Sequence, residues 1–113
     1  MTITNRTKGC ILAEKAGIAD TLASRMKGLL GRKGLDPGEA LVIIPCISIH
    51  TVGMRFPIDA VFFGRDNKAV ATLRHMKPYR LSGLYTSARG VIELPAGTLD
   101  RSPVDVGDLI DMT

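Results

Sequence analysis

The sequence contains no tryptophan and few other aromatic residues, with three phenylalanines and two tyrosines among 113 residues. Proteins that bind single-stranded nucleic acids stack the bases on exposed aromatic side chains. Phe62 and Phe63 stand in an apolar run that is typical of a core strand, which leaves only Tyr79 and Tyr85 for stacking. The aromatic content therefore argues against a nucleic acid as the partner.

Long apolar runs are also missing. The longest ones, at residues 41–45 and 60–63, fall far short of the roughly 20 residues that span a bilayer. Residues 1–20 carry several charged side chains and no apolar segment of the kind found in secretory signals. We therefore expect no membrane span and a cytoplasmic location.

Cysteine is scarce, since Cys10 and Cys46 are the only two. In a chain without a secretory signal, two cysteines are expected to be free thiols. Cys46 and His50 lie in a stretch that favours extended backbone, which would place their Cα atoms about 13 Å apart. Zinc ligands must come within about 4 Å of one another. We expect no metal site and no cofactor.

The composition is that of a folded domain, with 45% hydrophobic and 23% charged residues. A length of 113 residues predicts a single domain that spans residues 1–113. The net charge of +4 biases the surface toward anions without requiring a nucleic acid. The sequence thus allows a small anionic ligand or a protein as partner, and it does not indicate an oligomeric state.

The positive charge is unevenly distributed. No acidic residue occurs between Asp66 and Glu93, and this interval holds four arginines and lysines of interest, namely Arg74, Lys77, Arg80 and Arg89. These side chains could dock a partner. Alternatively, they belong to a solvated loop that the acidic C-terminal segment balances.

Apolar runs separated by turn residues predict at least six strands, within residues 10–19, 40–45, 60–63, 69–73, 91–94 and 109–112. Leu22, Met26, Leu29 and Leu30 recur at helical spacing, which predicts one helix over about residues 21–30. Asp20 is the expected N-cap, and Gly31 or Gly34 the expected end. The predicted fold is mainly β (α+β): a small, partly closed, antiparallel, barrel-like sheet with one packed α-helix.

The richest polar segment is PCISIHTVGMRFPID, residues 45–59. In one interpretation Arg55 and Asp59 form a structural ion pair. In the other, bends at Gly53 and Pro57 bring them toward His50 to form a pocket. Arg55 would then bind an anion, Asp59 would orient it, and His50 would donate a hydrogen bond or exchange a proton.

Glu93 stands between Ile92 and Leu94 in the segment VIELPAG. If its neighbours point inward, strand alternation makes Glu93 an exposed acid. If Glu93 points inward, it needs a partner such as Arg55 or Arg89. Both alternatives stay open at this point.

Four segments, SRMKGLLGR, PCISIHTVGMRFPIDAVFF, VIELPAG and VGDLI, occur in this order. Together they resemble the uncharacterised bacterial and archaeal family DUF192, also called UPF0127, over residues 10–112. The resemblance implies a small, mainly β domain with one helix packed on it. It implies no reaction. The residues on which it rests include Arg25, Gly28, His50, Thr51, Met54, Asp59 and Glu93.

Three functions are compatible with these residues. The first is a binding module for an anionic ligand or peptide, with a pocket of His50, Thr51, Arg55, Asp59 and Glu93. The second is a structural or regulatory adaptor that docks proteins through the basic 74–89 loop. The third is an enzyme with His50 as general acid or base, although no motif for nucleophilic or metal catalysis is present.

Overall fold

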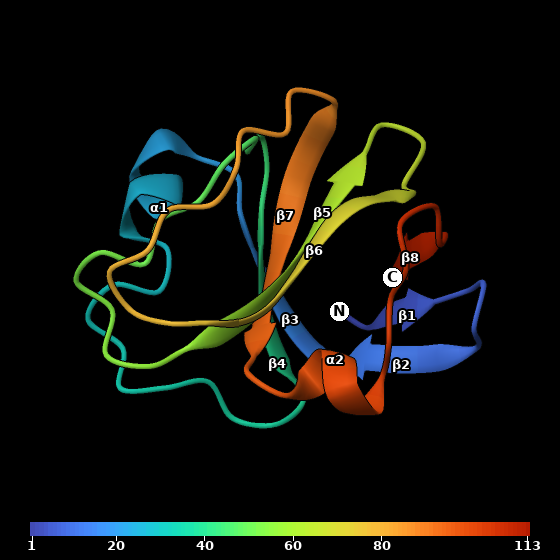
Figure 1. Cartoon of the computed structure of the whole chain (residues 1–113), viewed down its shortest axis with the longest axis horizontal. Helices are drawn as coiled ribbons and strands as arrows, with labels where there is room; N and C mark the ends of the chain where they lie inside the picture. Colours follow the sequence, from blue (N-terminus) through green and yellow to red (C-terminus); the bar gives the residue numbers. More distant parts are fainter.

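The computed structural model describes all residues from Met1 to Thr113 and contains eight strands and two short helices (Figure 1). The strands are β1 (Ile3–Asn5), β2 (Cys10–Ala13), β3 (Lys15–Ala19), β4 (Glu39–Ile43), β5 (Ile58–Gly64), β6 (Ala69–Met76), β7 (Ala88–Pro95) and β8 (Ile110–Met112). The helices are α1 (Leu22–Lys27) and α2 (Thr98–Arg101). The predicted mainly β class is therefore confirmed.

The strands form two sheets, in the orders β2-β1-β8 and β3-β4-β7-β5-β6. All neighbours are antiparallel except β3 and β4, which run parallel. The predicted strand region 10–19 splits because the chain turns at Glu14, where the amides of Glu14 and Lys15 both donate to Gly38 O at 2.9 and 2.8 Å. Two sheets thus replace the single partly closed antiparallel sheet predicted from the sequence.

Backbone contacts link the two sheets at their edges. The amide of Ala16 in β3 donates to Met1 O at 3.0 Å, and an isolated bridge joins Lys68, just before β6, to Leu109, just before β8. In Figure 1 the three-stranded sheet lies beside the five-stranded one, with both chain termini in it. The ladders themselves do not close into a barrel.

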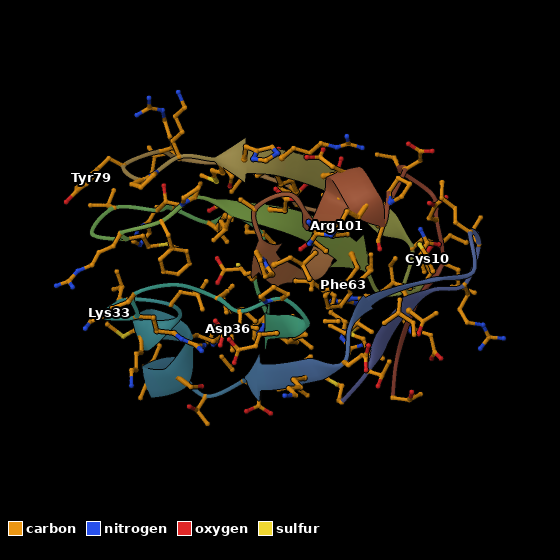
Figure 2. All side chains as sticks on the ribbon, turned by 90° about the horizontal axis from the view of Figure 1, so that it is seen from below. Cys10, Lys33, Asp36, Phe63, Tyr79 and Arg101 are labelled. Carbon is orange, nitrogen blue, oxygen red and sulfur yellow. The ribbon has the colours of Figure 1, made fainter.

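The core lies on both faces of the five-stranded sheet. Alternate side chains of β5 enter different clusters: Phe62 packs on one face with Val91, while Phe63 packs on the other with Ile92. The three-stranded sheet and α2 cover the Phe63 face (Figure 2), and the segments that follow α1 and β4 cover the Phe62 face. Both faces of β5 and β7 are therefore covered, which explains why their apolar residues do not alternate with polar ones.

Helix α1 is shorter than predicted. Thr21, not Asp20, is its N-cap, and a capping box joins the side chains and backbones of Thr21 and Ser24 at 3.0 and 3.1 Å. Gly28, with a φ of +46°, ends it before Gly31. No residue of α1 itself is buried. With 6 residues, this longer of the two helices is well below the length needed to cross a bilayer.

Helix α2 was not predicted from the sequence. It follows β7 directly and begins after Gly97, whose φ of +93° favours glycine. Its first turn is held by the carboxylate of Asp59, which accepts the amides of Gly97 at 3.1 Å and Leu99 at 2.8 Å. The helix therefore depends on a residue of β5, which local sequence patterns do not reveal.

Candidate functional site

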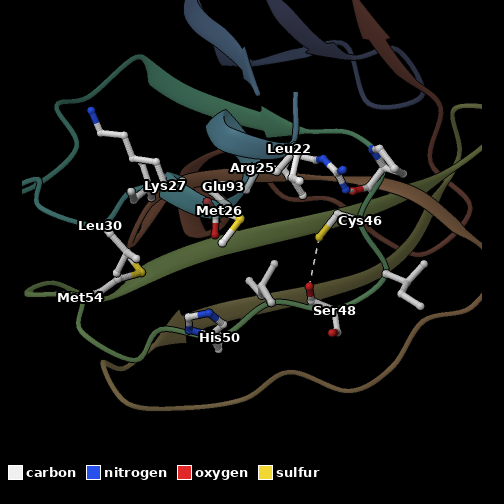
Figure 3. A pocket seen from close by; sticks show the side chains of 16 residues that line it. Leu22, Arg25, Met26, Lys27, Leu30, Cys46, Ser48, His50, Met54 and Glu93 are labelled. Carbon is white, nitrogen blue, oxygen red and sulfur yellow. Dashed lines mark hydrogen bonds between the residues drawn. The ribbon is translucent and has the colours of Figure 1, made fainter. Parts of the chain in front are cut away.

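A cavity of about 540 Å³ lies between α1 and residues 45–50, over the ends of β4 and β7 (Figure 3). Most of its lining is apolar. Leu22, Met26 and Ile47 are 67%, 72% and 40% exposed, because their side chains border this space instead of packing in the core. The polar side chains of the lining are Arg25, Lys27, Cys46, Ser48, His50 and Glu93. The volume is typical of a small-molecule site.

Glu93 is the most deeply placed ionisable group of the cavity. Strand alternation in β7 puts it on the same face of the sheet as Val91, below α1, and Figure 3 shows its carboxyl directed into the cavity. Glu93 is only 4% exposed, and it forms no ion pair in the structure. Burial without a compensating partner raises the pKa of its carboxyl to about 7.

Arg25 reaches the cavity from α1. Its guanidinium makes one long hydrogen bond, from an Nη atom to Pro45 O at 3.4 Å, and its Nε is buried without a partner. It forms no ion pair with Glu93 or any other acid. The cavity therefore holds a carboxyl and a guanidinium that are both free to bind another group.

Cys46 is a half-buried free thiol, as is Cys10, which confirms the expected absence of a disulfide. The Cys46 thiol donates to Ser48 O at 3.0 Å (Figure 3). Burial, as the main cause, raises the pKa of this thiol, and the nearby Glu93 carboxyl adds to the shift. Cys46 is thus held as a thiol and lacks the thiolate character of a catalytic cysteine.

His50 lies at the exposed rim of the same cavity, so of the predicted site residues His50 and Glu93 both belong to its lining. Its backbone pairs with Leu81, and its Nδ1 accepts the amide of Val52 at 3.3 Å. No acidic side chain contacts the ring. The geometry therefore shows a rim residue without the carboxylate that usually orients a catalytic histidine.

Thr51, Arg55 and Asp59 do not line the cavity. Thr51 is fully buried, and its hydroxyl donates to Lys77 O at 2.6 Å and accepts the amide of Arg80 at 2.9 Å. It fastens the loop before β5 to the loop after β6.

Asp59 is also fully buried, but it lies on the opposite face of the sheet from Glu93 because of alternation along β5. Its carboxylate accepts hydrogen bonds from three backbone amides, those of His75, Gly97 and Leu99. Arg55 is exposed and pairs with no acid, so neither the ion pair nor the shared pocket considered for these two residues is formed.

The basic residues of the 74–89 interval are exposed, but the interval is not one loop as predicted: Arg74 lies in β6 and Arg89 in β7, and only residues 77–87 connect these strands. The basic residues also differ in their partners. Arg74 pairs with Asp100 at 3.3 Å, whereas Lys77 and Arg80 bind no acid. Between and beyond them, Tyr79, Leu81 and Leu84 are 66%, 79% and 67% exposed, and Tyr79 projects from the tip of the molecule in Figure 2. The loop thus presents apolar as well as basic side chains to solvent.

Comparisons with known proteins agree with the resemblance seen in the sequence. The chain matches the family DUF192, described as "Uncharacterized ACR", over residues 2–112. It is 33% identical to a UPF0127 protein of Thermococcus sibiricus, with 95% of this chain and 71% of that protein aligned. It is 31% identical to a UPF0127 protein of Pyrococcus furiosus, with 95% and 94% aligned.

Among solved structures, the fold is similar to a crystal structure of a protein of unknown function from Novosphingobium aromaticivorans. The TM-score is 0.83 at 22% identity, covering 98% of this chain and 82% of that one. This likeness concerns the fold alone. The chain belongs to the DUF192/UPF0127 family, an uncharacterised family for which no function is established.

Proposed function

We propose that this protein is a binding module, and that its cavity between α1 and residues 45–50 binds a small ligand with an apolar body. The observation that carries the proposal is Glu93, a buried carboxyl directed into an apolar cavity without any protein partner. Burying such a group is costly unless something pairs with it. A ligand that donates a hydrogen bond to Glu93 would remove this cost.

The exposed apolar side chains of α1 support the same function. In most surface helices the apolar face packs against the core. In α1 the apolar residues Leu22 and Met26 are largely exposed at the edge of the cavity. A ligand with an apolar body would cover them, and each Å² of apolar surface removed from water contributes about 25 cal/mol.

A thermal-shift screen tests this proposal. We expect at least one apolar compound among carboxylates, amines, nucleosides, sugars and short peptides to raise the Tm of the wild type by several degrees. A ligand at 100 times its Kd stabilises the fold by about 2.7 kcal/mol. Met26→Lys should abolish the shift, because it places a long charged side chain at the apolar wall.

The matched control is Ala23→Lys, which adds the same side chain to an exposed position of α1 outside the cavity lining. It should retain the ligand-induced shift. The proposal fails if no compound shifts the wild type, or if both lysine variants respond as the wild type does.

A protein adaptor is the second candidate, and the exposed side chains of residues 74–89, from the end of β6 to the start of β7, favour it. Clustered apolar groups with basic neighbours are common at docking surfaces. The triple variant Arg74→Ala, Lys77→Ala, Arg80→Ala should abolish capture of a protein partner while leaving the thermal shift of cavity ligands unchanged. If neither property changes in this variant, the adaptor function is excluded.

A further inference from the structure

We propose that the cavity selects a small zwitterion with apolar side chains, of the size of a dipeptide. Its ammonium group would bind Glu93, and its carboxylate would bind Arg25. This inference rests on the proposed function and names the ligand class for the same cavity. Two observations support it: the Glu93 carboxyl and the Arg25 guanidinium line the same cavity without pairing with each other, and apolar side chains form the wall beside them.

The position of Glu93 favours a cationic group at the floor of the cavity. An ionised carboxyl with 4% exposure is stable only beside a positive charge or several hydrogen-bond donors. Arg25, a basic side chain of the same lining, instead donates to Pro45 O. Since no side chain of the protein pairs with Glu93, a ligand that brings a cation would bind its ionised form, and a primary ammonium is compact enough for a buried site.

The position of Arg25 favours a ligand with an anionic group that lies farther from the cavity floor than Glu93 does. A guanidinium binds a carboxylate through two parallel hydrogen bonds, and the single long bond to Pro45 leaves most of its donors free. Lys27 also belongs to the lining. A ligand with only an ammonium group would meet Arg25 and Lys27 as like charges, whereas a carboxylate on the same ligand is attracted to them.

The size and walls of the cavity favour a body of apolar side chains. About 540 Å³ lies within the range that small-molecule ligands occupy. Leu22, Met26 and Ile47 form the wall that such side chains would cover. Leucyl-leucine combines an ammonium, a carboxylate and two branched apolar side chains, so it is the probe for the test.

The test compares leucyl-leucine with its N-acetylated form and its C-terminal amide by isothermal titration calorimetry at pH 7.5. For the wild type, we expect acetylation to weaken binding at least tenfold, and amidation to weaken it several-fold. Glu93→Gln should bind the free and the acetylated peptide with similar Kd. Arg25→Ala should no longer distinguish the acid from the amide. Glu93→Gln therefore no longer distinguishes the free from the acetylated peptide but still distinguishes the acid from the amide, and Arg25→Ala shows the reverse.

Proton release provides a second readout that a merely structural role would not produce. In the free protein the Glu93 carboxyl has a pKa of about 7, so at pH 6 it is mostly protonated. An ammonium bound beside it would hold it ionised. We expect binding at pH 6 to release close to one proton per complex in the wild type and none in Glu93→Gln, measured by titration in buffers of different ionisation enthalpy.

The outcomes separate the two proposals. Equal binding of free and acetylated leucyl-leucine, or no binding of either, overturns the zwitterion inference. If another apolar compound then shifts the wild type but not Met26→Lys, the binding function still stands. If no compound binds, both proposals fail.

Discussion

Glu93→Gln is expected to be more stable than the wild type at alkaline pH, and to lose most of this advantage in acid. Burial raises the pKa of Glu93 to about 7, above the ordinary value of 4.5 that applies in the unfolded chain. Between these two values the unfolded state has lost the proton and the folded state keeps it, so the free energy of unfolding falls as pH rises and levels off above pH 7. The gain of the variant over the wild type should be about 3 kcal/mol larger at pH 8 than at pH 4.

Urea denaturation of both proteins at pH 4, 6 and 8 measures this difference, because other titrations contribute equally to each and cancel. Glu14→Gln is the control, since it makes the same change at an exposed position. It should not reproduce the gain at pH 8 that is expected of Glu93→Gln. A constant effect of Glu93→Gln across this range would show that folding does not raise the pKa of this carboxyl, and would remove the cost of burial on which the proposed function rests.

Asp59→Ala is expected to lower the free energy of unfolding by about 4 kcal/mol, since it removes a fully buried carboxylate and leaves the three backbone amides that donate to it without an acceptor. The amide of His75 donates to one carboxylate oxygen at 2.8 Å, and those of Gly97 and Leu99 donate to the other at 3.1 and 2.8 Å. Such a loss is a large share of the 5–15 kcal/mol typical of whole domains. It should appear as a lower urea midpoint.

Two variants check the interpretation of this loss. Asp59→Asn keeps one acceptor oxygen, so its stability should lie between those of the wild type and Asp59→Ala. Asp20→Ala removes an exposed carboxyl and should change stability by less than about 0.5 kcal/mol. An unchanged midpoint in Asp59→Ala would contradict the role of Asp59 as the anchor of α2.

Apolar runs in the sequence predicted the strands in which most consecutive residues are buried. They missed the elements whose formation depends on residues far away in the sequence. The apolar runs of β4, β5 and β7 are visible in the sequence because both faces of these strands are covered. Strand β1 is short and contains the polar Asn5, which is fully buried, and its side-chain amide donates to the distant Asp108 at 2.9 Å and to Pro103 O at 3.1 Å. The parallel pairing of β3 with β4 likewise has no local signature.

The candidate site was predicted in part, for a related reason. His50 and Glu93 were identified, but the direction of Glu93 could not be decided, since a strand buried on both faces has no alternation to follow. Arg55 and Asp59 are close to His50 in sequence, yet β5 turns Asp59 to the other face of the sheet. Arg25 and Cys46 were missed as pocket residues, because only the folded chain brings them beside Glu93. The arginine stands in a segment that carries the family resemblance.

The pairing of β1 between β2 and β8 affects the order in which the protein folds during synthesis. Ile3 pairs with Met112, so β1 leaves the ribosome well before the neighbour β8 with which it pairs. The strands of the five-stranded sheet all precede β8 and can pair before it is made. Until then one edge of β1 stays open to pairing with other chains. We therefore expect the nascent chain to be most prone to association just before β8 emerges.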